Sequence, residues 1–303
     1  MAFSMHSHSG QFCPGHAKDE LEHIIQTAIA RGMTTLGLTE HMPRHDDKDL
    51  YPEEIAGGHT IADLLPRHAA YLIEAQRLRK KYASKISLLI AFEGDWIRPS
   101  YGPFIQTLAS DPAIDYFIGS VHHVHEIPID YDSSFYSLAR EKAGGTDELL
   151  FQEYFDAQFE MLTALKPRVV GHFDLIRLLA QDQNRDLREW KGVWERVERN
   201  LRLIVEQGGL VEVNSAGLRK GLKEPYPMKC VVERLVGLGG RLTLSDDSHG
   251  VEQVGTNYGR MIEYLEGLGV SEVWTLVGKG VDGIEEVGVK KVLLEDVKKS
   301  FKA

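Results

Sequence analysis

Alternation between short apolar runs and longer amphipathic stretches is the feature of this sequence that most restricts its fold. The apolar runs have the length and composition of buried parallel strands, at 34–39, 85–93, 115–123, 168–174, 209–214, 241–245 and 272–277. Between them, apolar residues recur with a helical period over 66–82, 147–165, 190–206, 228–238 and 255–267. Because this order continues along all 303 residues, it predicts a parallel α/β protein.

Local signals add detail to this outline. The first helix is expected to begin at a capping box formed by Asp19 and Glu22 and to end at Gly32. The polar segment 124–146 is expected to be a long surface loop. No change in composition marks a second domain, so residues 1–303 are predicted to form one domain, of a length compatible with a closed α/β barrel.

Charge and cysteine content limit the classes of partner and compartment. There are 45 acidic against 35 basic residues, which disfavours a nucleic acid or an anionic membrane as the main partner. A small phosphorylated substrate needs only a local basic pocket and stays open. No signal peptide and no apolar run near 18 residues is found, and Cys13 and Cys230 are too few for a disulfide framework. These features indicate a cytoplasmic protein; they do not indicate its oligomeric state.

Acidic and imidazole side chains gather at the ends of the expected strands, of which the first lies at the N-terminus. In chain order they are His6, His8, Glu40, His41, Glu93, His122, His123, His172, Asn214, Asp246, Asp247 and His249. The carboxyl ends of the strands in a (β/α) barrel converge on one face, where active sites are built. These residues are therefore expected to meet in one pocket.

The composition of this set points to a metal cluster. His6 and His8 form an H-x-H pair whose rings lie on the same side of an extended segment. With His16 and the other strand ends, the set exceeds the four ligands of one zinc ion and indicates two or three divalent ions. Imidazole and carboxylate donors suit Zn, Mn or Fe(II). Clustered ions lower the pKa of bound water and hold phosphoryl oxygens, so metal-assisted hydrolysis is the predicted reaction class.

The motifs H-S-H, T-E-H, E-G-D, S-V-H-H, G-H-F-D and S-D-D-S-H resemble, in this order over roughly residues 3–250, those of the PHP (polymerase and histidinol phosphatase) superfamily. The segment VEVNSAGLRKGLKEPYP (211–227) is similar to that of its monofunctional histidinol-phosphate phosphatases. The resemblance implies a single distorted (β/α)₇ barrel with a trinuclear metal site. It further implies hydrolysis of L-histidinol phosphate to L-histidinol and phosphate, in histidine biosynthesis, by attack of a metal-bridging hydroxide.

The same resemblance distributes the ligands among three ions. The first ion takes His6, His8, Glu93 and Asp247; the second shares Glu93 and adds His122 and His172; the third takes His16, His41 and His249. Asp246 is an alternative to Asp247, and His123 is an alternative to His122. Asp247 and His249 are also counted among the catalytic residues, whereas Glu40 is expected to support a ligand rather than bind metal.

Two arginines match the phosphate-binding positions of that family, Arg177 and Arg219. A guanidinium can hold two phosphate oxygens and stabilise the charge that develops there, so both are also expected to be catalytic. The amine and imidazole of the substrate are expected to be oriented by Glu212, Asn214 and Glu224. The residue that protonates the leaving group is not indicated.

Two other functions stay open at this point. A barrel of this family could act on nucleotides or nucleic-acid ends, or it could be a non-catalytic metal-binding protein. The N-terminal segment offers a test of the metal cluster: deletion of residues 1–8 is expected to abolish metal-dependent activity while the fold is largely retained.

Overall fold

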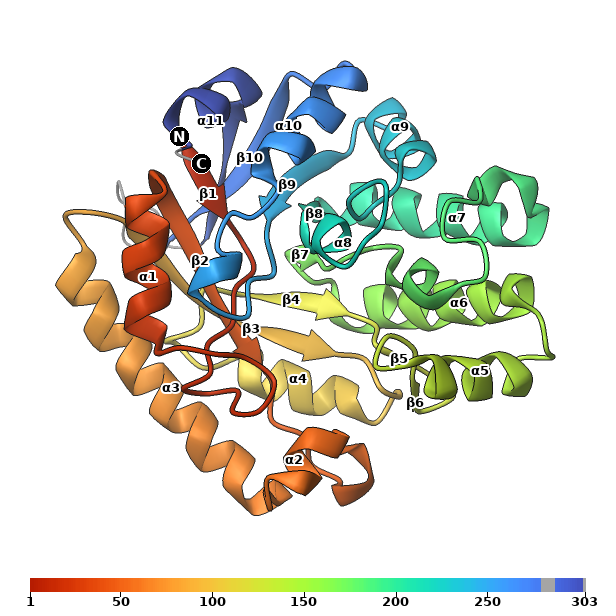
Figure 1. The fold of residues 1–303 in the computed structure, drawn as a ribbon, viewed down its shortest axis with the longest axis horizontal. Coiled ribbons are helices and arrows are strands. Elements are labelled where there is room, and N and C mark those ends of the chain that lie inside the picture. Colours follow the sequence, from red (N-terminus) through yellow and green to blue (C-terminus); the bar gives the residue numbers. More distant parts are fainter. Residues whose placement is uncertain (279–286, 302–303) are drawn as a thin grey trace.

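The computed structural model describes residues 1–278 and 287–301, and its centre is a parallel sheet that curls into a nearly closed barrel (Figure 1). Its seven strands are β1 (Ala2–Ser4), β2 (Met33–His41), β3 (Ser87–Asp95), β4 (Tyr116–Ser120), β7 (Val169–Val170), β8 (Leu210–Asn214) and β9 (Arg241–Ser245), hydrogen-bonded in this order. The first and last strands meet where the backbone N–H of Met5 donates to the oxygen of Leu244, at 3.0 Å. The predicted parallel α/β barrel is thereby confirmed.

Helices surround this barrel and bury one face each against it (Figure 1). The main ones are α1 (Leu21–Ala30), α3 (Ile61–Tyr82), α4 (Tyr101–Ala109), α6 (Asp147–Leu165), α7 (Lys191–Gln207), α9 (Lys229–Gly237) and α10 (Tyr258–Gly267). In α7, the apolar residues Val193, Val197, Leu201 and Ile204 recur every three or four positions and are buried. None of the helices in the described parts of the chain is long and apolar enough to cross a membrane.

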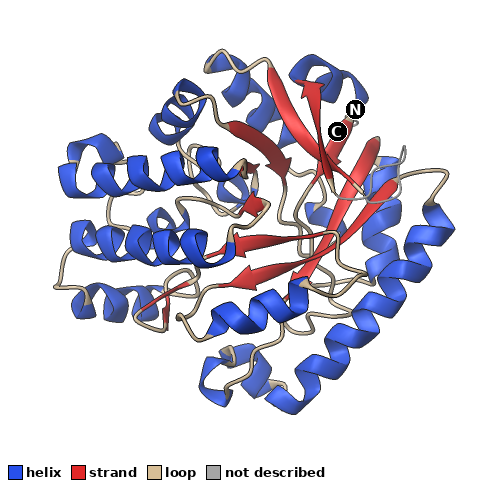
Figure 2. Cartoon of the chain, turned by 180° about the vertical axis from the view of Figure 1, so that it is seen from behind, coloured by secondary structure: helices blue, strands red, loops and turns tan. Residues whose placement is uncertain are grey.

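The prediction for 272–277 is wrong in one respect. This segment is a strand, β10 (Glu272–Val277), but it pairs antiparallel with β11 (Gly288–Leu293) in a separate two-stranded sheet. A short helix, α11 (Leu294–Ser300), follows, and Figure 2 shows the pair from behind. A mostly apolar run of this length has the same appearance in either sheet, because apolar composition reports burial and not the direction of the partner strand.

The segment 124–146 is not a loop throughout. It contains a hairpin of β5 (His123–Val124) and β6 (Ile127–Pro128), followed by α5 (Ser133–Lys142). The carboxylate of Asp132 caps α5 by accepting from the backbone N–H of Ser134 at 2.7 Å and of Phe135 at 2.9 Å. A capped helix with a mostly polar face therefore accounts for the polarity of this segment.

The predicted capping box of the first helix is also wrong. Glu20 is the N-cap of α1, and the carboxylate of Asp19 instead accepts from the backbone N–H of Val251 at 2.9 Å, which ties two loops together. The end of the helix is as predicted, because Gly32 follows it with a φ of 80°, in the left-handed region that favours glycine.

The N-terminal segment is part of the barrel core. Ala2, Phe3 and Met5 are each at most 1% exposed. The hydroxyl of Tyr116, on β4, donates to the backbone oxygen of Met5 at 2.6 Å. Gly37, on β2, leaves room for that contact, because a Cβ there would lie 2.0 Å from the Tyr116 hydroxyl. Removing residues 1–8 would therefore remove a barrel strand, contrary to the expectation that the fold is largely retained.

Candidate metal centre

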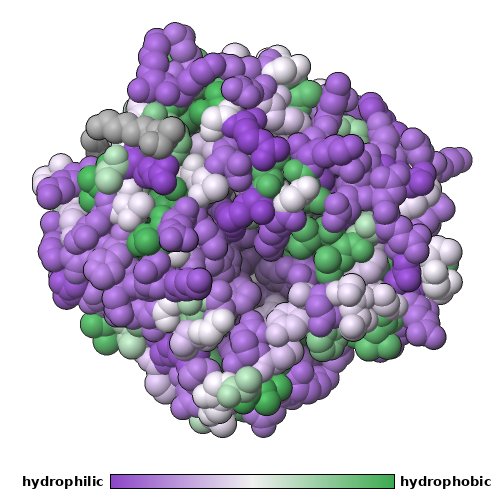
Figure 3. Space-filling model, viewed as in Figure 1, coloured by the Kyte–Doolittle hydropathy of each residue, from purple (hydrophilic) through white to green (hydrophobic). Residues whose placement is uncertain are grey.

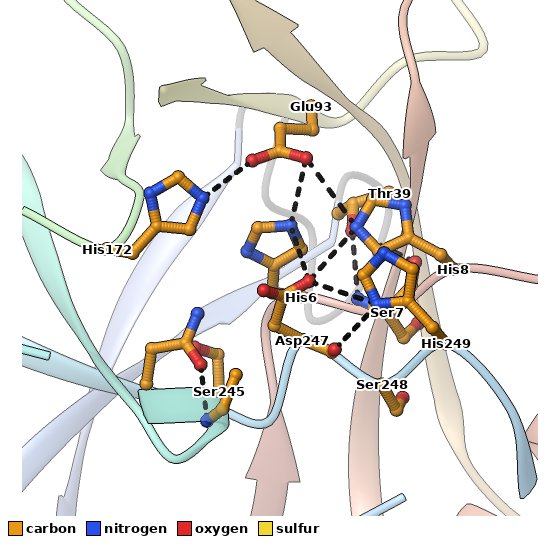
Figure 4. A network of polar contacts seen from close by, with 12 residues as sticks. His6, Ser7, His8, Thr39, Glu93, His172, Ser245, Asp247, Ser248 and His249 are labelled. Atoms are coloured by element: carbon orange, nitrogen blue, oxygen red, sulfur yellow. Dashed lines mark hydrogen bonds and ion pairs between the residues drawn. The ribbon is translucent and has the colours of Figure 1, made fainter. Parts of the chain in front are cut away.

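The predicted strand-end residues converge at one end of the barrel, as Figure 4 shows for part of the set. His6 and His8 follow β1, His41 ends β2, Glu93 lies in β3, His122 follows β4, His172 follows β7, and Asp247 and His249 follow β9. All of these side chains except His41 and His249, which are partly exposed, are buried. Parallel strands bring these residues together although they are spread over most of the chain.

Glu93 lies at the centre of the cluster and is 1% exposed. Its Oε1 is 3.0 Å from Nε2 of His172 and 3.4 Å from Nε2 of His122. Its Oε2 is 3.1 Å from Nδ1 of His41 and 3.4 Å from Nε2 of His6. Because each oxygen faces a different group of imidazoles, this carboxylate could hold a cation on each side (Figure 4).

Asp247 closes the cluster on the side of β9. Its Oδ1 lies 3.3 Å from Nε2 of His8 and 3.5 Å from Nε2 of His6. Asp246 is turned away instead: its carboxylate accepts from Ser4 Oγ at 3.0 Å and from the backbone N–H of Gly255 at 2.5 Å. Of the two predicted alternatives, Asp247 is therefore the one that faces the imidazoles.

The donor atoms form three overlapping groups in which all candidate ligand atoms lie within 4.8 Å of one another. These groups are His6–His8–Glu93, Glu93–His122–His172 and His8–His41–His249. The first two match the predicted sets, apart from Asp247. In the third, His8 stands where His16 was expected. His16 lies at the rim, with its side chain 38% exposed and its Nδ1 2.9 Å from Oε1 of Glu53.

Unpartnered nitrogens show that these residues fit a metal. Among the described residues, Nε2 of His6, both ring nitrogens of His8 and Nε2 of His41 are buried without a hydrogen-bond partner. A buried polar atom without a partner costs on the order of 1–3 kcal/mol. Two of them, Nε2 of His6 and Nε2 of His8, lie 3.3–3.6 Å from the same oxygens of Glu93 and Asp247. Imidazole nitrogens and carboxylate oxygens gathered in this way are a donor set that a divalent cation satisfies.

The pKa values in the cluster separate into two classes. Burial, followed by repulsion from neighbouring imidazoles, lowers the pKa of His8 and of His41 to about 3, and burial lowers that of His249 to about 3. These rings are therefore neutral, the state that binds metal. Burial also opposes charge on His6, but Asp247, Glu212 and Glu93 outweigh it and raise its pKa well above the usual value.

The carboxylates respond in the opposite direction. Burial alone would raise the pKa of Glu93, but His6 and His122 lower it well below its usual range. The pKa of Asp247 is lowered in the same way, with His6 and His249 outweighing burial. Both groups are therefore ionised and can act as anionic ligands.

Acidification is expected to destabilise the metal-free protein between pH 6.5 and about 3. In that window the folded state keeps His8, His41 and His249 neutral, whereas the unfolded chain protonates histidines near 6.5. The unfolded state then binds more protons than the folded state. Each of these rings therefore lowers the free energy of unfolding by up to ~1.4 kcal/mol for every unit that the pH decreases. His122, whose pKa is raised to about 10, stays protonated in the folded state throughout this window. Glu40, whose pKa burial raises to about 8, offsets about one ring down to pH ~4.5, so the net loss comes from the remaining rings. Denaturant unfolding of chelator-treated protein at several pH values measures this; an unfolding free energy that does not change across the window would contradict it.

Asp95 contacts the predicted ligand His122 and was missed by the sequence analysis. Its carboxylate is 3.4 Å from Nδ1 of His122 and 3.2 Å from Nδ1 of His123. The Nε2 of His122 faces Glu93, so His122 and not His123 belongs to the cluster. The available signal was the spacing: Asp95 follows Glu93 by two positions on one strand, and both side chains point to the same side.

The two predicted substrate contacts on β8 lie beneath the cluster. Glu212 and Asn214 are each 0% exposed, and the amide of Asn214 donates to Glu212 at 2.8 Å. Both oxygens of Glu212 are engaged by donors of neighbouring strands. These positions do not face a substrate, because alternation along β8 turns both side chains into the barrel.

The predicted phosphate residues have other contacts. Arg219 donates to the backbone oxygens of Asp246 at 3.0 Å and of Asp247 at 2.8 Å, and so holds the loop that carries the ligand. Arg177 is 2% exposed and donates to the backbone oxygens of Glu224 at 2.9 Å and of Pro225 at 2.5 Å. Glu224 accepts from the backbone N–H of Lys229 at 2.8 Å and lines, with Arg177, a separate cavity.

A pocket of about 290 Å³ opens over the metal ligands, at the hollow in the hydrophilic face shown in Figure 3. Its wall includes four residues that the sequence analysis missed: Tyr51, Asp130, Tyr131 and Lys220. Among the described residues that line it, Lys220 is the one lysine or arginine. Asp130 and Tyr131 come from the segment 124–146, which thus contributes to the pocket wall.

Comparisons with known proteins agree with this geometry. Residues 4–216 match the family described as PHP domain. A Schizosaccharomyces pombe protein named "Probable histidinol-phosphatase" is 43% identical to this chain, over 88% of this chain and 86% of that protein. The Saccharomyces cerevisiae histidinol-phosphatase is 32% identical, over 86% of this chain and 87% of that protein. The crystal structure of the Lactococcus lactis histidinol phosphate phosphatase, complexed with zinc, L-histidinol and phosphate, has a TM-score of 0.68 at 20% identity and covers 95% of this chain and 98% of that one. With most of its length matched and its predicted ligand residues at the ends of the barrel strands, the chain belongs to the PHP domain family.

Proposed function

We propose that the protein is a histidinol-phosphatase, a phosphomonoesterase that hydrolyses L-histidinol phosphate to L-histidinol and phosphate. The observation that carries this proposal is the cluster around Glu93, whose two oxygens face separate groups of imidazoles at the floor of an open pocket. The names of the relatives at 43% and 32% identity support the substrate and a place in histidine biosynthesis. We assign the activity to one domain made by residues 1–303, working in the cytoplasm.

Two or three divalent ions are proposed as cofactors, with zinc favoured because the Lactococcus lactis structure contains it. The three donor groups, supplemented by Asp247, would hold them, with His16 available from the rim. Bound divalent ions lower the pKa of water and polarise a phosphoryl group. What the chain itself contributes is a rigid set of ligands, because each one is fixed at the end of a barrel strand.

The phosphate is proposed to lie between the metal ligands and a cationic wall. Lys220 lines the pocket, and Arg219, which precedes it, has N–H groups beyond the two that hold the backbone of Asp246 and Asp247. Arg177 donates to two backbone oxygens and lines a separate cavity, so its role as a second phosphate residue stays a prediction. These cations would neutralise charge that develops on the phosphoryl oxygens.

The other end of the substrate carries an amine and an imidazole. We propose that the carboxylate of Asp130 pairs with the amine and that the rings of Tyr51 and Tyr131 contact the imidazole. These two rings are stacked with their centroids 6.4 Å apart, and both line the pocket. This assignment replaces Glu212, Asn214 and Glu224, whose polar atoms are engaged elsewhere.

Phosphate release from L-histidinol phosphate by purified, metal-replete protein tests the proposal. We expect activity that is lost on chelation and restored by Zn or Mn. A panel with nucleoside monophosphates and 3′- or 5′-phosphorylated oligonucleotides serves as the control for specificity. Preference for the nucleotides would overturn the substrate, and no recovery of activity on any phosphoester would indicate a metal-binding protein without catalysis.

A further inference from the structure

Glu212 occupies a position that catalysis of a phosphoester does not by itself explain. It lies on β8, is 0% exposed, contacts the ring of His6 and the backbone at His172, and is not among the residues that line the pocket. A buried carboxylate is costly unless donors surround it. Its contacts therefore indicate what it is for.

The donors to Glu212 come from four strands of the barrel. Its Oε1 accepts from the backbone N–H of His172 at 2.6 Å and from the amide of Asn214 at 2.8 Å. Its Oε2 accepts from Oγ of Ser245 at 2.8 Å and from Nδ1 of His6 at 3.1 Å. The carboxylate thus joins the ends of β1, β7, β8 and β9, where the barrel closes.

The contact with His6 determines which ring nitrogen carries hydrogen. An ionised carboxylate can only accept, so Nδ1 of His6 must be the donor. The other nitrogen, Nε2, is buried without a hydrogen-bond partner and lies 3.4 Å from Glu93 and 3.5 Å from Asp247. When His6 binds a cation as a neutral ring, Nε2 is therefore the nitrogen that would act as the ligand.

We propose that Glu212 is a positioning residue, which acts through His6 by fixing its ring orientation and tautomer so that Nε2 is presented to the metal site. The proposal rests on the metal centre assigned above and not on the identity of the phosphoester. Carboxylates that hold a metal-binding histidine in this way typically change metal affinity 10–100-fold when they are removed. The hydrogen bond from Ser245 anchors Glu212 but does not contact His6. Loss of this anchor can therefore be separated by mutation from loss of the contact between Glu212 and His6.

Glu212→Gln tests this, with Ser245→Ala and Glu40→Gln as matched controls. Glu40 is another buried glutamate, and it was expected to support a ligand. Within the described residues, the hydrogen bonds it accepts come instead from Ser9, through its hydroxyl at 2.6 Å and its backbone N–H at 3.2 Å. We expect Glu212→Gln to weaken the affinity for Zn about 10–100-fold in competition with a chromophoric chelator. Both controls should keep the wild-type affinity, and at saturating Zn the KM of Glu212→Gln should equal that of the wild type.

Two outcomes overturn the proposal. One is wild-type Zn affinity in Glu212→Gln together with a raised KM, which would make Glu212 a substrate contact. The other is a hydrogen on Nε2 of His6 instead of Nδ1, observed by ¹⁵N NMR of the wild-type holoenzyme. This measurement does not depend on whether a variant folds. Because Zn affinity and the tautomer are measured without substrate, they decide the role of Glu212 even if L-histidinol phosphate is not hydrolysed.

Discussion

Glu93→Gln is expected to lower kcat for the phosphoester by at least ~10³-fold and to reduce the number of ions retained per chain. An amide has one acceptor oxygen, and its NH₂ group has no lone pair to offer. In either orientation it would present hydrogens to one of the two imidazole groups that Glu93 now faces, through Oε1 to His172 and through Oε2 to His41. The bridge between the two cation positions would be lost although the side-chain volume is unchanged.

Metal analysis of the purified variant, together with kcat and KM at saturating metal, measures this effect. Glu40→Gln is the control, since it makes the same change in a buried glutamate of the neighbouring strand β2. Its carboxylate contacts Ser9 and not the imidazole cluster. A full complement of ions in Glu93→Gln, with kcat within about tenfold of the wild type, would contradict the bridging role.

Deletion of residues 1–8 is expected to unfold the protein as well as to inactivate it. The deletion removes β1, its pairing with β2, and the bond from Met5 to Leu244 that closes the barrel. Phe3 and Met5 alone contribute about 1.5–3 kcal/mol each by burial. Domains are typically stable by only about 5–15 kcal/mol, so losing a core strand removes most of that margin. Circular dichroism and denaturant unfolding of the truncated chain measure this.

The double variant His6→Ala/His8→Ala separates the metal from the fold. It removes two ligands but keeps β1 and its buried side chains, so we expect a folded protein without metal-dependent activity. A truncated chain with wild-type unfolding behaviour would show that β1 is dispensable. Retained activity in the double variant would show that His6 and His8 are not ligands.

Strand order and burial were predictable from the sequence, because a parallel barrel strand is apolar on both faces and its helices carry a single buried stripe. The direction of β10 was not, since its apolar run is the same for a parallel strand and for the antiparallel pair that it forms with β11. The helix α5 was missed because its hydrophobic residues are few and its cap, Asp132, resembles an ordinary turn residue.

The ligands were predictable for a related reason: parallel strands place their carboxyl ends on one face, so residues after each strand could be grouped without knowing distances. What each polar residue contacts required coordinates. Sequence places Glu212 and Asn214 near the site, but only the barrel closure shows that they lie beneath the ligands. Likewise, the choice between Asp246 and Asp247 depended on the loop, in which Asp247 has a φ of 48° and turns its carboxylate toward the imidazoles.

The seam at which β1 meets β9 has a consequence for how the protein is made. His8 is synthesised before its neighbour Asp247, which follows it by roughly 240 residues. At ~5–20 residues per second, the two meet only about 10–50 s after His8 is synthesised. Until then, His6 and His8, which follow the first strand, lack the carboxylate of Asp247, which follows the last strand. If the proposed ligands hold metal, a full complement of ions could be taken up only after translation has passed Asp247 and His249, so that metal loading would report a completed barrel.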